Sequence, residues 1–248
     1  MVFCYSKFLK VKPFKLSRFI HYIFSKELRH ILFQVCIFFL FSISVQCQDQ
    51  RDPVRVACIG NSITYGAGVK NRAANCYPNQ MQRMLGEKYE VQNFGVNGAT
   101  LLNLGDKPFM KENAYKEALL FKPEIVIIKL GTNDSKPQNW DDFKSYFIRD
   151  YKSLTGSFRT ANPDVKIFIC LPVPAFGEAF GIREKVIKEE ILPLVKIIAA
   201  EEKATLIDLH TALSDAGELF PDKIHPNAKG ANKIAEAVFE AIKSIKVR

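Results

Sequence analysis

Ser62 lies in the stretch VACIGNSITYGAG (56–68), at a glycine-bounded bend that follows an apolar segment. A serine at such a bend can be a helix N-cap, part of a phosphate-binding loop or a nucleophile. Gly60, Gly66 and Gly68 do not follow the spacing G-x-G-x-x-G, and no G-K-[ST] occurs here, so a phosphate-binding loop is disfavoured. The local sequence does not decide whether Ser62 is a helix cap or a nucleophile.

Three later segments carry further polar groups that acyl transfer would require. They are NFGVNGAT (93–100), GTNDS (131–135) and FPDKIHPN (220–227). Ester hydrolysis needs a hydroxyl nucleophile, a base for its proton, a carboxylate that fixes the base, and hydrogen-bond donors for the oxyanion. With Ser62, the segments contain one of each. Asp222 and His225 lie three positions apart before Pro226, so one short turn can pair the carboxylate with the imidazole.

Each of these residues also has an ordinary structural explanation. Gly98 permits a tight turn, Asn133 can bond its own backbone in a turn, and His225 can be a lone exposed imidazole. Asp222 and Asn227 can be turn or cap residues. The joint occurrence, rather than any single residue, favours the chemical interpretation.

The elements that must position these segments alternate along the chain. Strands are expected at 54–60, 89–96, 124–131, 165–172 and 205–209. Helices are expected at 76–88, 113–122, 140–162, 183–203 and 227–245, with Asn139 and Asn227 as caps and an interruption at Pro193. This alternation predicts an α/β fold, a single domain over 48–248 with a parallel sheet covered on both faces. In such sheets the chemistry lies at the carboxyl ends of the strands, and all the polar segments come after strands.

The segments GNSITYG, NFGVNG, GTND and DKIHPN resemble the four blocks of the SGNH (GDSL-type) hydrolase family, in the family's order and across residues 54–230. The resemblance implies a flavodoxin-like, three-layer αβα fold, doubly wound around a five-stranded parallel sheet. It implies that Ser62 is the nucleophile, that His225 is the general base and then the general acid, and that Asp222 orients His225. The oxyanion would be held by the backbone N–H groups of Ser62 and Gly98 and by the side-chain amide of Asn133.

Two positions within these blocks need comment: one required a choice between two glycines, and the other departs from the family's commonest residue. Gly98 is matched to the family's oxyanion glycine, rather than Gly95, because it is the second glycine of the N-x-G-x-x-G run. The family's commonest first block has Asp before the serine, where this chain has Asn61. That position is not one of the catalytic groups, so the change bears on loop rigidity or subfamily more than on activity.

A second histidine, His210 in LIDLHTAL, offers an alternative base because Asp208 precedes it by two positions. Such a histidine is more often packed or capping, so His225 is favoured. The two histidines and scattered carboxylates that follow the first 47 residues give no closely spaced ligand set. We therefore expect no metal and no cofactor.

The substrate is indicated by the resemblance alone. The blocks are similar to those of secreted carbohydrate acetylesterases, which implies a Ser-His-Asp esterase that removes small O-acetyl groups through an acyl-enzyme on Ser62. The alternatives are a lysophospholipase-like or thioesterase-like acylhydrolase and, in another class, a non-catalytic secreted sugar-binding module. The loop LPVPAFGEAFG (171–181) should border the site, and its Phe176 and Phe180 are candidates for a substrate pocket, although aromatic loop pairs are as often local packing.

Residues 1–47 have the layout of a secretory signal, with seven Lys/Arg against one Glu, an apolar run at 31–45 and a polar exit. The run is shorter than the roughly 20 apolar residues that cross a bilayer. This predicts a secreted or periplasmic protein cleaved near Cys47, with an uncleaved anchor or a lipidated Cys47 as alternatives.

Without this leader the net charge falls from +9 to +3, and no Lys/Arg run interleaved with aromatic residues remains. The expected partner is a small-molecule or glycan ester, not nucleic acid, and any membrane association would be through the leader. Cys58, Cys76 and Cys170 are an odd set with no close pair, which indicates no disulfide framework.

Overall fold

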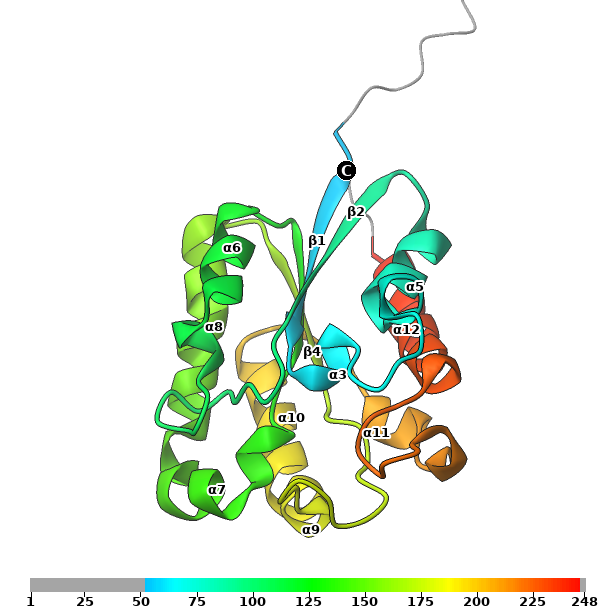
Figure 1. Cartoon of the computed structure of the whole chain (residues 1–248). Helices are drawn as coiled ribbons and strands as arrows, with labels where there is room; N and C mark the ends of the chain where they lie inside the picture. Colours follow the sequence, from blue (N-terminus) through cyan, green and yellow to red (C-terminus); the bar gives the residue numbers. More distant parts are fainter. Residues whose placement is uncertain (1–51, 246–248) are drawn as a thin grey trace, which may run out of the picture. The chain divides into compact units, whose positions relative to one another are not determined.

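The computed structural model of the chain describes residues 52–245 (Figure 1). The expected leader and its cleavage or lipidation site at Cys47 lie outside these residues. No helix within 52–245 has the length and apolar character needed to cross a membrane.

Five parallel strands form one sheet in the order β2-β1-β3-β4-β5. Their bounds are Val54–Gly60 (β1), Tyr89–Gly95 (β2), Ile125–Lys129 (β3), Lys166–Cys170 (β4) and Thr205–Ile207 (β5). The central strand β3, IVIIK, is buried along its whole length, as a β-branched run covered on both faces should be. Gly60 pairs with Gly95 on one side and with Lys129 on the other, so β1, β2 and β3 end at the same level.

Helices cover both faces of the sheet (Figure 1). One face carries α6 (Asn113–Leu120), α8 (Phe147–Ala161) and α10 (Leu192–Glu201); the other carries α5 (Tyr77–Leu85) and α12 (Ala228–Lys243). Successive side chains of β3 alternate between the two hydrophobic cores: Val126 and Ile128 face the first, Ile125 and Ile127 the second. The predicted three-layer, doubly wound α/β fold is confirmed.

The single helix predicted over 140–162 is wrong, because the structure divides it. A first helix, α7 (Pro137–Phe143), is followed by a 3₁₀ turn, η3 (Lys144–Tyr146), and then by α8. Pro137 suits the first helical position because its missing N–H would have no partner there. Asn139 is therefore not the cap, and its buried side chain bonds instead to a distant loop.

The helix predicted over 183–203 is interrupted as expected from Pro193. It consists of α9 (Glu184–Val186), a π-helical segment, η4 (Ile187–Ile191), and α10. At the junction the Leu192 N–H donates to the Ile187 carbonyl, one residue farther back than in an α-helix. This wider turn occurs where the proline lacks an N–H for the normal helical bond.

The sequence pattern did not predict several short elements, two of which, α3 (Ser62–Tyr65) and η2 (Asn133–Ser135), contain Ser62 and Asn133. The others are α4 (Arg72–Asn75), η1 (Phe109–Lys111), α11 (Leu209–Ala212) and η5 (Gly217–Leu219). The last strand is shorter than predicted because Asp208 ends it, its side chain accepting from the Thr211 N–H as the N-cap of α11. The predicted cap of α12 is confirmed: the Asn227 side chain accepts from the Lys229 and Gly230 N–H groups at 2.9 and 3.0 Å.

Candidate active site

Ser62 is the first residue of α3. This short helix follows the carboxyl end of β1 (Figure 1). The cap of this helix is the preceding residue, Asn61, whose side-chain oxygen accepts from the Ile63 N–H at 3.1 Å. Asn61 is fully buried, so the position that departs from the common family block has a structural role as the cap. Because Asn61 supplies the cap, the Ser62 hydroxyl remains available for another interaction.

That hydroxyl meets the imidazole of His225, from the loop before α12. The Ser62 Oγ lies 2.8 Å from His225 Nε2, and His225 Nδ1 lies 2.7 Å from Asp222 Oδ2. A carboxylate can only accept a hydrogen bond, so Nδ1 carries the proton and Nε2 can accept from the serine. This is the tautomer that a general base acting on Ser62 requires.

One tight turn fixes the Asp222 carboxylate against His225. Its Oδ1 accepts from the backbone N–H groups of Ile224 and His225 at 3.0 and 2.6 Å, while Oδ2 faces the imidazole. Lys223, between them, has a φ of 74°, the left-handed conformation that brings both ends of the turn together. Burial acts to raise the pKa of Asp222, but these hydrogen bonds outweigh it and hold the pKa below its ordinary value.

Two glycines of the NFGVNG segment have different physical reasons to be glycine. A Cβ on Gly95 would lie 2.1 Å from the Tyr65 backbone nitrogen, so Gly95 allows β2 to pass close to α3. Gly98 has a φ of 79°, which a side chain would strain, although a Cβ there would meet nothing nearer than Lys107 at 3.7 Å. Backbone conformation, rather than space, therefore accounts for Gly98.

Asn133, in η2 after β3, lies against the segment that follows Gly98. Its side-chain amide donates to the Ala99 carbonyl at 3.0 Å, and its backbone carbonyl accepts from the Asn139 side chain at 2.9 Å. Asn133 is buried, with 7% of its surface exposed. The amide has a second hydrogen, so this bond does not exhaust its capacity as a donor.

The loop between β2 and α6 is further held by residues that were not among the sequence-predicted site residues. Asp134, fully buried, accepts from the Leu101 and Leu102 N–H groups at 3.1 and 2.8 Å. Asn139 accepts from the Asp106 N–H at 2.7 Å and donates to the Asp106 carboxylate at 3.0 Å. A sequence signal existed for Asp134, because an acid in the short segment after a buried strand must find hydrogen-bond partners if it is to be buried.

Burial raises the pKa of Asp134 from its ordinary 3.8 to about 6, although the backbone N–H groups that it accepts from act in the opposite direction. The carboxylate thus packs against the loop that carries Gly98, and its burial makes the ionised form unfavourable.

The alternative base, His210, is hydrogen-bonded to Glu184 and not to Ser62. Its Nε2 is 2.9 Å from Glu184 Oε1, and the other oxygen of Glu184 accepts from the Ala175 N–H at 2.7 Å. Asp208, the acid noted beside it in the sequence, bonds Thr211 instead. His210 therefore links α11 to the start of α9 and to the loop after β4.

The two phenylalanines of that loop differ in their surroundings. Phe176 is half-buried, with its ring 4.9 Å from that of Phe220. Phe180 is 62% exposed, and its ring lies 5.4 Å from the His225 imidazole at an interplanar angle of 62°.

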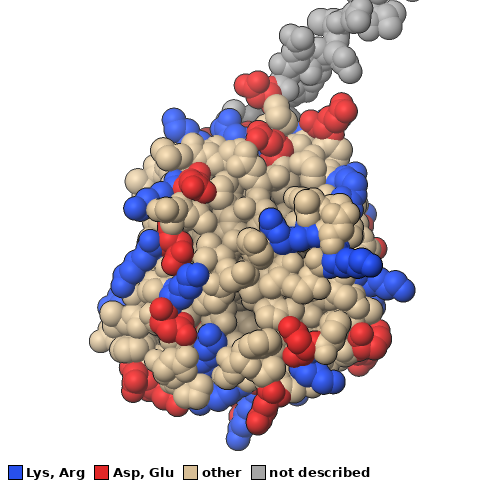
Figure 2. All heavy atoms as spheres, viewed as in Figure 1, with Lys and Arg blue, Asp and Glu red and all other residues tan. Residues whose placement is uncertain are grey.

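Other features of residues 52–245 do not add a second chemical centre. Cys58, Cys76 and Cys170 are buried free thiols, and this part of the chain contains no group of three or more His, Cys, Asp or Glu residues placed to hold a metal ion. On the face drawn in Figure 2, basic and acidic side chains are interspersed.

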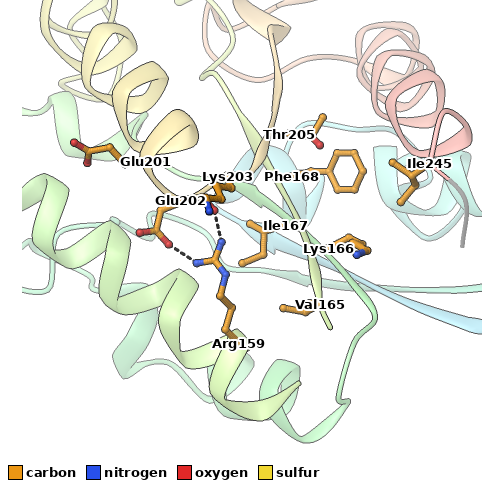
Figure 3. A pocket seen from close by; sticks show the side chains of 10 residues that line it. All are labelled: Arg159, Val165, Lys166, Ile167, Phe168, Glu201, Glu202, Lys203, Thr205 and Ile245. Atoms are coloured by element: carbon orange, nitrogen blue, oxygen red, sulfur yellow. Dashed lines mark hydrogen bonds and ion pairs between the residues drawn. The ribbon is translucent and has the colours of Figure 1, made fainter. Parts of the chain in front are cut away.

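A cavity of about 420 Å³ is lined by residues at the amino ends of β4 and β5 (Figure 3). Ser62, by contrast, follows the carboxyl end of β1. Arg159 in this cavity is paired with Glu202. Its lining contains neither serine nor histidine. The hydrogen-bonded pair of Ser62 and His225 lies instead at the end of the sheet where the carboxyl ends of the strands meet.

Known proteins resemble this chain in sequence. A family model described as "GDSL-like Lipase/Acylhydrolase family" matches residues 58–233. An acetylxylan esterase of Xylanibacter ruminicola is 45% identical over 215 residues, which cover 78% of this chain and 44% of that protein. This chain therefore spans less than half the length of that relative.

Two solved structures have similar folds. An acetyl xylan esterase superposes with a TM-score of 0.61 at 20% identity, covering 76% of this chain and 100% of its own. The aryl esterase of M. smegmatis superposes with a TM-score of 0.61 at 19% identity, covering 78% of this chain and 100% of its own. At such identities the likeness speaks for the fold alone.

Proposed function

The chain belongs to the GDSL-like lipase/acylhydrolase family, and from this premise we propose that it is a serine esterase that removes O-acetyl groups from carbohydrates. The observation that carries the proposal is the hydrogen-bonded chain from Ser62 Oγ to His225 Nε2, at 2.8 Å, and from His225 Nδ1 to Asp222 Oδ2, at 2.7 Å. The 45% identity to an acetylxylan esterase supports the acetyl and carbohydrate parts of it.

In the acylation half of the reaction, the Ser62 oxygen attacks the acetyl carbonyl while His225 Nε2 takes its proton. Asp222 stabilises the imidazolium that forms. The oxyanion accepts hydrogen bonds from the Ser62 and Gly98 N–H groups and from the free hydrogen of the Asn133 amide. The tetrahedral intermediate then collapses: the bond between the acyl carbon and the sugar oxygen breaks, His225 gives its proton to that oxygen, and the acetyl group stays on Ser62 as an ester.

Deacylation repeats these roles with water as the nucleophile. His225 removes a proton from the water, the same donors hold the second oxyanion, and the proton returns to Ser62 as acetate leaves. The position of Ser62 at the start of α3 supports its N–H as a donor. Within the described chain, neither that N–H nor the Gly98 N–H donates to another protein group.

Release of acetate tests this proposal. We expect the purified protein to release acetate from acetylated xylan and to prefer p-nitrophenyl acetate over the butyrate and octanoate. Ser62→Ala, which keeps the helix cap at Asn61, should lose both activities at an unchanged melting temperature. A wild-type preference for octanoate would favour the alternative, a lysophospholipase-like or thioesterase-like acylhydrolase.

The other alternative is a non-catalytic sugar-binding module. Covalent labelling of Ser62 distinguishes it from an esterase. A serine-directed organophosphonate should label Ser62 in the wild type and fail to label His225→Ala, because the base activates the hydroxyl. An unlabelled wild type that still binds acetylated glycans would favour the binding module.

Export is the last part of the proposal, because polysaccharide substrates lie outside the cell. Residues 1–47 would direct the protein to the periplasm or the medium. N-terminal sequencing of the protein recovered from a bacterial host should give a start near residue 48, and a lipid-modified Cys47 or an intact leader would favour a membrane anchor instead.

A further inference from the structure

Phe180 has a backbone conformation that its side chain disfavours. It is followed by Gly181, and the two have φ values of 54° and 73°. Ala179 and Ile182 flank them as an antiparallel bridge, with the Ile182 N–H donating to the Ala179 carbonyl at 3.0 Å. Two central residues of positive φ define a type I′ turn, whose first central position favours Asn, Asp or Gly. A bulky aromatic residue there is strained.

Burial does not compensate for this strain, since Phe180 is 62% exposed. The structure instead directs the ring toward the reacting groups, with its centroid 5.4 Å from that of His225. Strained conformations persist where the surroundings impose them, and they occur most often at functional sites. An exposed ring held beside the proposed base by a strained turn therefore calls for a functional explanation.

Contacts on both sides of the turn impose this conformation. Before it, the Phe176 N–H donates to the Lys223 carbonyl at 2.9 Å, which ties the loop to the turn of Asp222 and His225. After it, the Arg183 N–H donates to Ser135 Oγ at 3.1 Å, next to the segment of Asn133. The loop is thus anchored to the histidine segment at one end and to the asparagine segment at the other.

We propose that Phe180 is the platform on which the sugar ring of the substrate stacks, and so is a specificity-determining residue. The inference rests on the proposed function, and it names the part of the substrate that is recognised beyond the acetyl group. A pyranose ring has an apolar face of C–H groups, and an exposed aromatic ring beside the nucleophile offers a matching surface. Phe176 is not assigned this role because its ring packs against Phe220.

Three variants separate the aromatic ring from the turn that carries it. Phe180→Asn installs a residue that the turn favours, Phe180→Trp keeps an aromatic platform, and Leu120→Ala, at a 78% exposed position on α6, is the control for loss of an exposed apolar side chain. The substrates are methyl 2,3,4-tri-O-acetyl-β-xylopyranoside, which has a sugar ring, and methyl acetate, which has none.

We expect Phe180→Asn to raise KM for the xyloside roughly 10-fold, the size of one stacking contact, with kcat close to wild type. Its kcat/KM for methyl acetate and the pH profile of that activity should be unchanged, because His225 keeps its partners. Relief of the strained backbone should raise the melting temperature by a few degrees, roughly 2–4 °C. Phe180→Trp and Leu120→Ala should retain the wild-type KM for the xyloside.

A wild-type KM for the xyloside in Phe180→Asn overturns the inference. An equal loss on both esters overturns it as well, because the ring would then act on His225 rather than on the sugar. A wild-type protein that cleaves methyl acetate but not the xyloside refutes the carbohydrate part of the proposed function, and the inference falls with it. Failure of the inference on Phe180 can therefore be told apart from failure of the proposed function.

Discussion

The side-chain amide of Asn133 donates a hydrogen bond to the carbonyl of Ala99, at 3.0 Å, across 34 positions of sequence. Ala99 directly follows Gly98, so this bond fixes two proposed oxyanion donors relative to each other. Electrostatic stabilisation of an oxyanion depends on donors that are in place before the charge develops. The bond therefore holds the two donors in place in advance, although one follows β2 and the other follows β3.

Asn133→Ala should lower kcat by about 10²–10³-fold, the usual effect of losing one oxyanion donor, which corresponds to about 3–4 kcal/mol of transition-state stabilisation. The steady-state rate on p-nitrophenyl acetate measures the effect, with the melting temperature as the check on folding. Near-normal turnover in a folded variant would remove Asn133 from the mechanism.

Replacing each histidine by alanine distinguishes the two candidate bases. His225→Ala should lose about 10³-fold or more in kcat, because the proton acceptor for Ser62 is gone. His210→Ala should keep most of the activity and lose only the stability contributed by its bond to Glu184. An active His225→Ala protein would contradict the assignment of the base.

Gly98→Ala should reduce both stability and kcat. A side chain at a φ of 79° costs roughly 1–2 kcal/mol, and relief of that strain would rotate the proposed N–H donor. Gly86, with a φ of 72° and no atom within 4 Å of where a Cβ would lie, is the matched control away from the site. Gly86→Ala should be destabilised at least as much by thermal unfolding yet remain fully active. Unchanged kcat in Gly98→Ala would contradict the role of that N–H.

Asp134 should make the fold less stable as pH rises from about 4 to about 6. Its pKa is about 6 in the folded protein against an ordinary 3.8, so over this interval the folded state binds more protons than the unfolded state, and the free energy of unfolding falls with pH. The raised pKa can lower the free energy of unfolding by at most about 3 kcal/mol over this interval.

Other carboxylates also titrate in this interval, so Asp134→Asn is the reference for this effect. Urea unfolding at pH 4 and pH 7 should show that the wild type loses stability relative to the variant as pH rises. A constant difference between the two proteins would contradict the raised pKa.

Lys129→Met should stabilise the protein at pH 7. The Lys129 side chain is fully buried, and its ammonium has no hydrogen-bond partner among residues 52–245. Burial lowers its pKa from 10.5 to about 8, which amounts to a cost of up to about 3 kcal/mol below that pH. Between pH 8 and 10.5 the unfolded chain binds more protons, so the wild type gains stability as pH rises and the advantage of methionine shrinks. A less stable Lys129→Met protein at pH 7 would show that the ammonium is compensated.

The sequence by itself determined the strands, because a strand buried on both faces of a parallel sheet is a short, mostly apolar and β-branched run, whatever lies beside it. VRVACIG and EIVIIKLG are of this kind, and they place Ser62 and Asn133 at the carboxyl ends of β1 and β3. It also predicted the pairing of Asp222 with His225, since partners three positions apart depend only on local backbone geometry.

Only the tertiary structure decided which group each side chain bonds when the partner lies far along the chain. The neighbours of Asn139 in the sequence predict a cap, yet its partner is Asp106, 33 positions away. The local sequence allows Ser62 to be a helix cap, but its hydroxyl is hydrogen-bonded to His225, 163 positions away. Short polar side chains bond almost any nearby donor or acceptor, so their identity leaves the choice open. The packing of the chain decides it by determining which groups are close enough to bond and which are shielded from water.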